Sequence, residues 1–265
     1  MATLVVKEAT FGYGRNITLD SINLASKPGE LLGIIGPNGS GKTTLLKGLA
    51  GLLKAIKGEV FFNSTDITRV EHRTLAKKIA LVPQNAFLPD LFTALEIVLM
   101  GRTPHLGLLG HETEKDFCIA LHAMKVTRTL HLAQRRINEI SGGEKQRLII
   151  ARALAQEAEI LLLDEPTANL DINYQMETFN VLSKLCIGSN LTVITALHDL
   201  NLACQFCHRL LMLRDGLIYQ QGTPSDIISS SSIKQVFDAY VQVYPHPINN
   251  LPVAFITAPP EKKRK

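Results

Sequence analysis

The chain has 265 residues, of which 46% are hydrophobic and 20% charged, an ordinary composition for one large or two modest globular domains. Its formal net charge is +4, and residues 261–265, with one glutamate and four basic residues, contribute +3 of it. This distribution does not support a generally basic nucleic-acid-binding surface, and we expect the basic tail to be a solvated end, with weak contact to anionic lipid as an alternative. No run of about 18 apolar residues occurs, and residues 1–8 lack a signal-peptide pattern, so we expect a cytosolic chain.

The four cysteines are too few and too irregularly spaced for a disulfide framework. Cys204 and Cys207 form a Cys-x-x-Cys pair beside His208, a pattern that also occurs in redox and metal sites. However, these cysteines share one helical face with Leu200 and Ala203, at positions i, i+3, i+4 and i+7. This spacing favours buried free thiols.

The N-terminal region predicts short strands at residues 4–7, 17–24 and 30–35, separated by glycine and proline. Tyr13 lies between the first two strands in a stretch that is typical of a loop. An aromatic ring at this place could stack on a nucleotide base, an interaction worth about 1–3 kcal/mol. Alone, this signal is weak.

Residues 36–44 read Gly-Pro-Asn-Gly-Ser-Gly-Lys-Thr-Thr and fit the phosphate-loop template between a buried strand and a helix. Glycines let successive amide N–H groups face one concavity, and the following helix adds its positive N-terminal end. We expect Lys42 to reach the β- and γ-phosphates of a nucleotide and the Thr43 hydroxyl to bind Mg²⁺. An ordinary glycine-rich turn is the alternative, but both flanks favour the phosphate loop. The predicted phosphate-binding residues are Gly36, Asn38, Gly39, Ser40, Gly41, Lys42, Thr43 and Thr44.

The middle of the chain changes from strands to helices. Strands are predicted at residues 58–62 and 79–83, the second ending at Gln84. Thr93 with Glu96 forms a capping box that opens a helix, and a further helix is predicted at 114–125.

A third helix starts at Ser141, again with a glutamate, Glu144, three residues later, and runs to about Gln156. Because no strand is predicted between residues 85 and 156, we interpret this segment as a helical insertion in a larger α/β sheet.

The sheet resumes with an apolar strand at residues 159–163, of the type covered on both faces. Asp164 and Glu165 follow at its carboxyl end, where open α/β sheets bind ligands. Asp164 is expected to hold Mg²⁺ through water, and Glu165 to polarise a water that attacks the γ-phosphate. Helix caps or surface charges are the alternative, but uncompensated carboxylates after a buried strand are costly.

A further buried strand is predicted at residues 191–196, followed by His198, which could bond a phosphate oxygen although by itself it fits a capping role better. A hairpin is predicted at 210–220, and Thr223 opens a short helix with Pro224 at its first position. The last twenty or so residues, rich in proline, are predicted to be an irregular extension.

In this order, the motifs resemble those of the ATP-binding subunits of ABC transporters, over nearly all of residues 1–240. The resemblance identifies residues 36–43 as Walker A, 161–165 as Walker B and Ser141-Gly142-Gly143-Glu144 as the ABC signature. It identifies Tyr13 as the adenine-stacking residue, Gln84 as the Q-loop glutamine, Asn169-Leu170-Asp171 as the D-loop and His198 as the switch histidine. Two departures are Ile140 and Glu144, where the family most often has Leu and Gln.

The resemblance implies an α/β fold with a RecA-like core sheet, an N-terminal antiparallel β subdomain and a helical subdomain at about 86–156. It implies one ABC ATP-binding domain at 1–240 and a C-terminal extension at 241–265 with a basic tail. ATP and Mg²⁺ are the implied cofactors. The implied catalytic residues are Glu165, His198 and Gln84, and the implied metal ligands are Thr43, Gln84 and Asp164. The other implied ATP contacts are Tyr13, Ser141, Gly142, Gly143 and Asp171.

The resemblance also implies partners: a head-to-tail homodimer, two integral membrane permease subunits and an extracytoplasmic substrate-binding protein, without nucleic acid. The chain would lie at the cytoplasmic face of the inner membrane as a peripheral subunit. Residues 96–107 are similar to a segment of metal-chelate importers, which carry iron–siderophore, haem or cobalamin, with molybdate or tungstate relatives. Two alternatives stay open: a soluble ABC ATPase of DNA repair or translation, which usually has tandem domains, and a small-molecule kinase, which would leave the signature unexplained.

Overall fold

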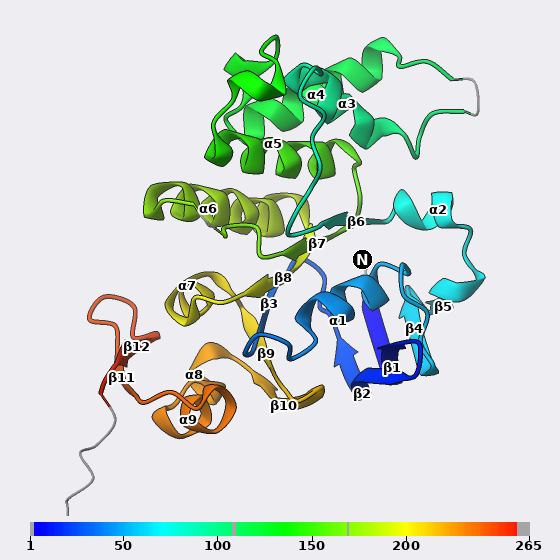
Figure 1. Ribbon diagram of the computed structural model, residues 1–265. Helices are drawn as coiled ribbons and strands as arrows, with labels where there is room; N and C mark the ends of the chain where they lie inside the picture. Colours follow the sequence, from blue (N-terminus) through cyan, green and yellow to red (C-terminus); the bar gives the residue numbers. More distant parts are fainter. Residues whose placement is uncertain (1–2, 108–109, 169, 259–265) are drawn as a thin grey trace, which may run out of the picture.

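The computed structural model describes residues 3–107, 110–168 and 170–258, and Figure 1 shows their arrangement. The described strands are β1 (Leu4–Tyr13), β2 (Asn16–Ala25), β3 (Leu31–Ile35), β4 (Lys57–Phe62), β5 (Thr65–Asp66), β6 (Ile79–Val82), β7 (Ile160–Asp164), β8 (Thr192–Leu197), β9 (Arg209–Arg214), β10 (Leu217–Gly222), β11 (Val241–Pro245) and β12 (Pro252–Ile256). The described α-helices are α1 (Lys42–Leu49), α2 (His72–Ala76), α3 (Ala94–Leu99), α4 (Glu114–Val126), α5 (Gly142–Ala155), α6 (Ile172–Ser189), α7 (Leu200–Phe206), α8 (Pro224–Ile227) and α9 (Ser230–Phe237). Short 3₁₀ turns lie at η1 (Ile67–Arg69), η2 (Met100–Arg102), η3 (Leu130–Leu132) and η4 (Ile137–Glu139).

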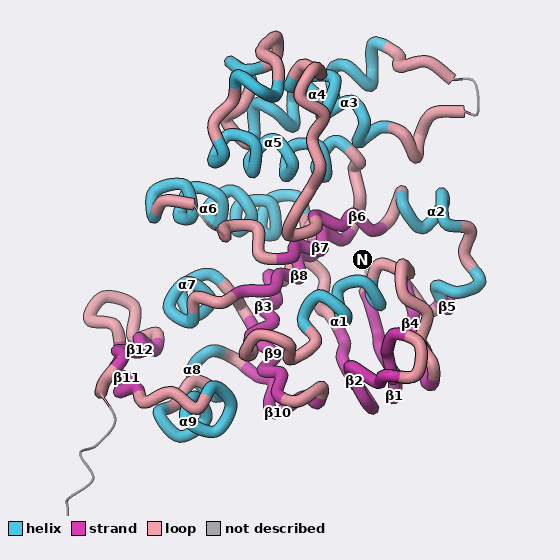
Figure 2. Tube along the Cα trace, viewed as in Figure 1, coloured by secondary structure: helices cyan, strands magenta, loops and turns pink. Residues whose placement is uncertain are grey.

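A six-stranded sheet in the order β10-β9-β3-β8-β7-β6 forms the centre of the molecule (Figure 2). All pairings are parallel except that of β10 with β9. Ile35 pairs with Leu197, and Asp164 pairs with Ala196, so β3, β7 and β8 end at the same level. The segments that follow these strands therefore leave the sheet at one edge, where ligands bind in open parallel sheets.

The N-terminal antiparallel sheet, in the order β2-β1-β4-β5, packs against α1. Phe11 of β1 is fully buried, and a Cβ atom at Gly48 of α1 would lie 2.5 Å from its ring. Glycine at position 48 therefore lets the phosphate-loop helix approach this sheet closely. The predicted antiparallel β subdomain is confirmed.

Helix α1 and the N-terminal sheet cover one face of the central sheet, and helices α6, α7, α8 and α9 cover the other. On this second face the ring centroids of Phe179 and Phe206 are 5.4 Å apart. Cys204 and Cys207 lie in this core as free thiols, as predicted. The Nδ1 atom of His208 accepts a hydrogen bond from the Leu31 amide at 2.8 Å. This geometry provides no support for a metal or redox site at the Cys-x-x-Cys pair.

The helices α3, α4 and α5 lie together above the sheet in Figure 1 and have a hydrophobic core of their own, which includes Ile97, Met124 and Leu148. Thr93 and Ser141 cap α3 and α5 through the predicted capping boxes. Among residues 86–107 and 110–156, the structure has helices and turns and a single isolated β-bridge. The predicted helical insertion is confirmed.

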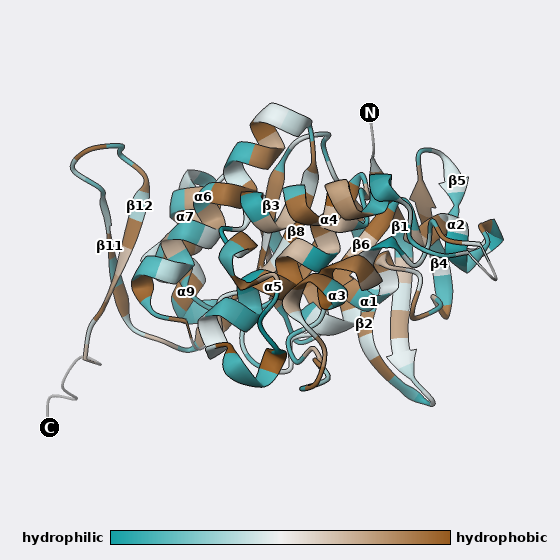
Figure 3. Cartoon of the chain, turned by 90° about the horizontal axis from the view of Figure 1, so that it is seen from above, coloured by the Kyte–Doolittle hydropathy of each residue, from teal (hydrophilic) through white to brown (hydrophobic). Residues whose placement is uncertain are grey.

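Two predictions of local structure are wrong. Tyr13 does not lie in a loop, because β1 continues to it and Tyr13 pairs with Asn16 across a tight turn. The segment after residue 240 is not irregular: β11 and β12 form an antiparallel hairpin at the opposite end of the molecule from β4 and β5 (Figure 3). Its prolines 245 and 252 are compatible with pairing because both lie at the strand ends next to the turn.

The hairpin packs against the core through Val241, Val243 and Ala254, and the side chain of Asn201 adds hydrogen bonds. Asn201 of α7 accepts a hydrogen bond from the Ala254 amide at 2.8 Å and donates one to the Ala254 carbonyl at 3.2 Å. The basic tail at residues 261–265, which we expected to be solvated, lies outside the described residues.

Candidate functional site

The phosphate loop joins β3 to α1, as predicted. Gly39 and Gly41 have φ angles of +79° and +102°, which favour glycine, and a Cβ atom on Gly41 would lie 2.5 Å from the Leu19 side chain. The first turn of α1 has no acidic residue, and its N-cap makes no side-chain hydrogen bond. The amide groups at this helix end are consequently open to an anion.

Lys42 is only 5% exposed and is folded back across the loop. Its Nζ atom donates to the carbonyl oxygens of Gly36 at 2.9 Å and Pro37 at 3.1 Å. Burial lowers the pKa of Lys42, while the neighbouring Glu165 and Asp164 carboxylates act in the opposite direction. The loop thus holds a cation at its centre, positioned to interact with a phosphate group.

Asp164 is the last residue of β7 and is buried. Burial raises its pKa, and a hydrogen bond from the Thr43 side chain opposes this shift. The Oδ1 atom of Asp164 and the Oγ atom of Ser40 are buried without a hydrogen-bond partner among the described residues. Unsatisfied oxygens in a buried site are costly, and a carboxylate with hydroxyl groups is the donor set that Mg²⁺ accepts. The residues present therefore fit a magnesium–phosphate group.

The side chain of Glu165 contacts residues from the segments that follow the two neighbouring strands, β6 and β8. Its Oε2 atom accepts a hydrogen bond from Gln84 Nε2 at 2.6 Å, and its Oε1 atom contacts Nε2 of His198. Gln84 follows β6, Glu165 follows β7 and His198 follows β8, so the common level of the strand ends brings them together. Glu165 has a φ of +53°, a strained value for this residue type that is often found at functional sites.

A cavity of about 470 Å³ lies between the phosphate loop and these three side chains. Its lining residues are Thr18, Asn38, Gly39, Gly41, Lys42, Thr43, Thr44, Gln84, Glu165 and His198. All but Thr18 were predicted from the sequence. Thr18 lies in β2 within an ordinary alternation of polar and apolar residues, so no sequence signal marks it.

Other predicted nucleotide contacts do not line this cavity. Tyr13 is 49% exposed, and the Nζ atom of Lys47 lies 5.9 Å from the centre of its ring. Ser141, Gly143 and Asp171 are also absent from the lining, whereas Gly142 lines a neighbouring cavity of about 430 Å³ that Gln84 and Glu165 share.

The signature and the D-loop segment contact each other within the chain. A Cβ atom on Gly143 would lie 3.4 Å from Tyr174 and 3.6 Å from Leu170. The guanidinium of Arg147 lies 4.5 Å from the centre of the Tyr174 ring. Asn169, the first residue of the predicted D-loop, lies outside the described residues.

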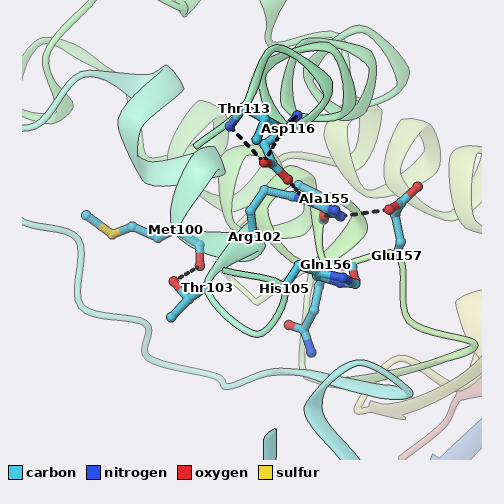
Figure 4. Close-up of polar contacts among 9 residues, drawn as sticks. All are labelled: Met100, Arg102, Thr103, His105, Thr113, Asp116, Ala155, Gln156 and Glu157. Carbon is cyan, nitrogen blue, oxygen red and sulfur yellow. Dashed lines mark hydrogen bonds and ion pairs between the residues drawn. The ribbon is translucent and has the colours of Figure 1, made fainter. Parts of the chain in front are cut away.

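The stretch at residues 96–107 is held by a buried arginine that sequence reasoning did not single out. Arg102 is 3% exposed, and its guanidinium donates to Asp116 Oδ1 at 2.8 Å, to the Ala155 carbonyl at 2.7 Å and to Glu157 Oε2 at 2.8 Å (Figure 4). His105 Nε2 lies 2.8 Å from the carbonyl oxygen of Gln156. These contacts connect η2 with the start of α4 and the end of α5, so this stretch is a structural element of the helical group.

Among the described residues, no helix is both long enough and apolar enough to cross a membrane. The family model of the ABC transporter matches residues 19–168. A cobalamin import ATP-binding protein, BtuD, of Halobacterium salinarum is 39% identical over 85% of this chain, but the chain spans only 56% of that relative's length.

Two other similarities extend over nearly the whole length of both chains. The achromobactin transport ATP-binding protein CbrD of Dickeya dadantii is 36% identical over 96% of this chain and 94% of its own. A solved structure described as an inward-facing metal-chelate type ABC transporter superposes with a TM-score of 0.85 and 28% identity, covering 97% of this chain and 98% of that chain.

Proposed function

Because this chain belongs to the ABC transporter family of ATPases, we propose that it is the ATP-hydrolysing subunit of an importer of metal chelates. The proposal of ATP hydrolysis rests on the position of Glu165, which contacts Gln84 and His198 and lines the same cavity as the phosphate loop. The transported substrate is inferred from the names of the relatives, which include cobalamin and achromobactin transport proteins. An iron–siderophore, haem, cobalamin, molybdate or tungstate substrate is consistent with this proposal.

Residues in and around the cavity would bind different parts of ATP. The amide groups of the phosphate loop and Lys42 bind the β- and γ-phosphates, and Tyr13 stacks on the adenine. The oxygens of Thr43, Gln84 and Asp164 would hold Mg²⁺, which would neutralise charge on the phosphate oxygens.

Glu165 is the residue that acts on water. Its carboxylate accepts a proton from the water whose oxygen attacks the γ-phosphorus, while the bond to the ADP oxygen breaks. His198 and Gln84 hold this carboxylate in place before the reaction, as their contacts indicate, and His198 then contacts the γ-phosphate.

Completion of the site requires a second copy of the chain. Ser141 and Gly143 do not line the nucleotide cavity of their own chain, although they lie at the N-terminal end of α5, where the helix dipole attracts negative charge. We propose that two copies pack head to tail, so that Ser141, Gly142, Gly143 and Asp171 of one contact the nucleotide bound by the other. ATP then holds the dimer closed and hydrolysis opens it.

The proposal includes the surrounding assembly. Two permease subunits in the inner membrane would bind the two ATPase subunits at its cytoplasmic face, near Gln84 and the helical subdomain at about 86–156. The extracytoplasmic binding protein would deliver the chelate to the permease. Residues 1–240 would form the ABC ATP-binding domain, and residues 241–265 a C-terminal extension with a basic tail.

ATP hydrolysis by the purified chain tests the proposal, measured alone and then in lipid vesicles with the membrane proteins encoded beside it, a binding protein and candidate chelates. We expect one loaded binding protein to stimulate phosphate release. If the membrane partners have no effect and nucleic acid or ribosomes stimulate hydrolysis instead, the chain is a soluble ABC ATPase and the importer proposal fails.

A further inference from the structure

The signature serine is already engaged by a carboxylate of its own helix. The Ser141 hydroxyl donates to Glu144 Oε2 at 2.7 Å, and the Ser141 amide donates to the same atom at 3.0 Å. In return, the Ser141 Oγ atom accepts a weak hydrogen bond from the Glu144 amide at 3.4 Å. This capping box satisfies two amide groups at the start of α5, those of Ser141 and Glu144, without any ligand.

The same contacts are unfavourable for an incoming phosphate. A serine hydroxyl has one proton, and while Glu144 accepts it, Ser141 presents only lone pairs toward an anion. A carboxylate at this helix end also repels the negative charge that the amide groups and the helix dipole would attract.

The groups around Glu144 keep its carboxyl ionised. The hydrogen bonds from the Ser141 hydroxyl and amide lower the pKa of Glu144, and Arg147 and His131 act in the same direction. His131 Nε2 lies 3.7 Å from Glu144 Oε1, but its side chain is 62% exposed, so it screens the charge weakly. The guanidinium of Arg147 also interacts with two other residues: it lies over the Tyr174 ring, and its Nη1 atom is 3.6 Å from Glu177 Oε2. It therefore neutralises the charge of Glu144 only in part.

We propose that Glu144 is a positioning residue that masks Ser141 and raises the ATP concentration needed to close the dimer. The inference rests on the proposed function, because it requires Ser141 to meet the γ-phosphate held by a second copy. Closure then includes an exchange in which Ser141 transfers its hydrogen bond from Glu144 to the phosphate. The negative charge of Glu144 opposes that exchange and so favours reopening after hydrolysis.

The test replaces Glu144 by Gln, whose side-chain oxygen accepts the same two hydrogen bonds without the charge. The Glu144→Gln change is made in a Glu165→Gln chain, so that bound ATP is not consumed, and dimer formation is followed by analytical ultracentrifugation over a range of ATP concentrations. We expect the half-maximal ATP concentration to fall about fivefold at low salt, as estimated for one charge removed near a phosphate at the protein surface. The difference should shrink in about 0.5 M NaCl, because salt screens exposed charges.

Glu96 offers a matched control. It forms the same capping box with Thr93 at the start of α3, with hydrogen bonds at 2.7 and 2.8 Å, and it does not line the nucleotide cavity. Glu96→Gln should leave the half-maximal ATP concentration unchanged. A merely structural role for Glu144 would change the melting temperature of both variants alike and leave the ATP dependence of dimer formation unmoved.

The two proposals fail in different ways. If the Glu165→Gln chain forms a dimer with ATP but Glu144→Gln gives the same ATP dependence at both salt concentrations, the charge of Glu144 does not oppose closure, its proposed role is wrong and the ATPase proposal stands. If the Glu165→Gln chain binds ATP and forms no dimer at any ATP concentration, the dimer model itself is wrong, and the role of Glu144 is rejected with it.

Discussion

Glu165 and His198 contact each other through the Oε1 and Nε2 atoms, although 33 positions separate them in the chain. The contact exists because β7 and β8 are adjacent parallel strands, whose last paired residues are Asp164 and Ala196. Glu165 and His198 follow one and two residues after this pair, respectively. Gln84 completes the arrangement from the next strand, β6. A carboxylate held on both sides is fixed in direction, which is what a group that must orient one water molecule requires.

The first prediction concerns the Glu165 carboxylate. Glu165→Gln keeps the size of the side chain and removes the proton acceptor, so ATP should still bind while the turnover number falls by about 10²-fold or more. Because hydrolysis is blocked, an ATP-bound dimer should accumulate. Phosphate release and gel filtration with ATP measure the two effects.

A surface carboxylate provides the control for this change. Glu159 precedes the same strand at its opposite end and forms an ion pair with Lys78, with both side chains more than a third exposed. Glu159→Gln should leave hydrolysis unchanged. Hydrolysis by Glu165→Gln at the rate of the unmodified chain would remove Glu165 from its role.

The second prediction concerns nucleotide affinity. Lys42→Ala removes the cation that the Gly36 and Pro37 carbonyls hold within the phosphate loop, so the dissociation constant for ATP should rise by about tenfold or more. Fluorescent-nucleotide titration measures this change. The matched control is Lys115→Ala, an exposed lysine of α4, which should bind ATP normally. Equal affinity in both variants would contradict the phosphate-loop assignment.

The candidate site was more predictable from sequence than the outer parts of the fold, because its residues lie in short sequence patterns. The phosphate loop and the two acids after β7 depend on residue types that follow a buried strand directly, and such short patterns are visible in a single chain. By contrast, α6 begins after Asp171 with a mixture of β-branched, aromatic and polar residues, and no helix was predicted there. Its packing against the sheet, including the buried Phe179, decides its conformation.

The hairpin β11–β12 was missed for a different reason. Its prolines are turn and loop signals in sequence, but in the structure they lie at the end of a two-stranded ribbon, where no amide donor is required. Likewise, the burial of Arg102 depends on Asp116 and Glu157, which are distant in sequence and meet only in the folded helical group. Contacts of this kind leave no local pattern.

The third prediction concerns the cysteines. Burial raises the pKa of Cys186 and Cys204 to about 12 and that of Cys207 well above its ordinary value, whereas Cys118 is exposed. A raised thiol pKa leaves almost no thiolate at pH 8, and the thiolate is the reactive form. Brief treatment of the native chain with iodoacetamide at pH 8 should therefore add one label, on Cys118. Intact mass measurement should show four labels after unfolding in urea, and two or more in the native chain would contradict the burial of this group.

The fourth prediction concerns the buried ion pair of Arg102 with Asp116, whose side chains are 4% and 8% exposed. Asp116→Asn leaves the buried arginine charge without the more buried of its two carboxylate partners, so the free energy of unfolding at pH 7 should fall by about 3 kcal/mol. Arg128→Gln breaks the exposed pair of Arg128 with Glu177 and should cost less than about 1 kcal/mol. Urea unfolding followed by circular dichroism compares the two variants with the unmodified chain.

The pH dependence of this loss separates the charge of Asp116 from the size of its side chain. Hydrogen bonds from Thr113 and Arg102 hold the pKa of Asp116 well below its ordinary value of about 4. A carboxyl with a depressed folded-state pKa stabilises the fold fully above the unfolded pKa, and this contribution decreases as the pH falls from about 4 toward the folded-state pKa. The difference between Asp116→Asn and the unmodified chain should therefore be constant between pH 6 and 8 and begin to shrink below about pH 4. A difference that stays constant down to pH 3 would mean that Asp116 acts through packing alone.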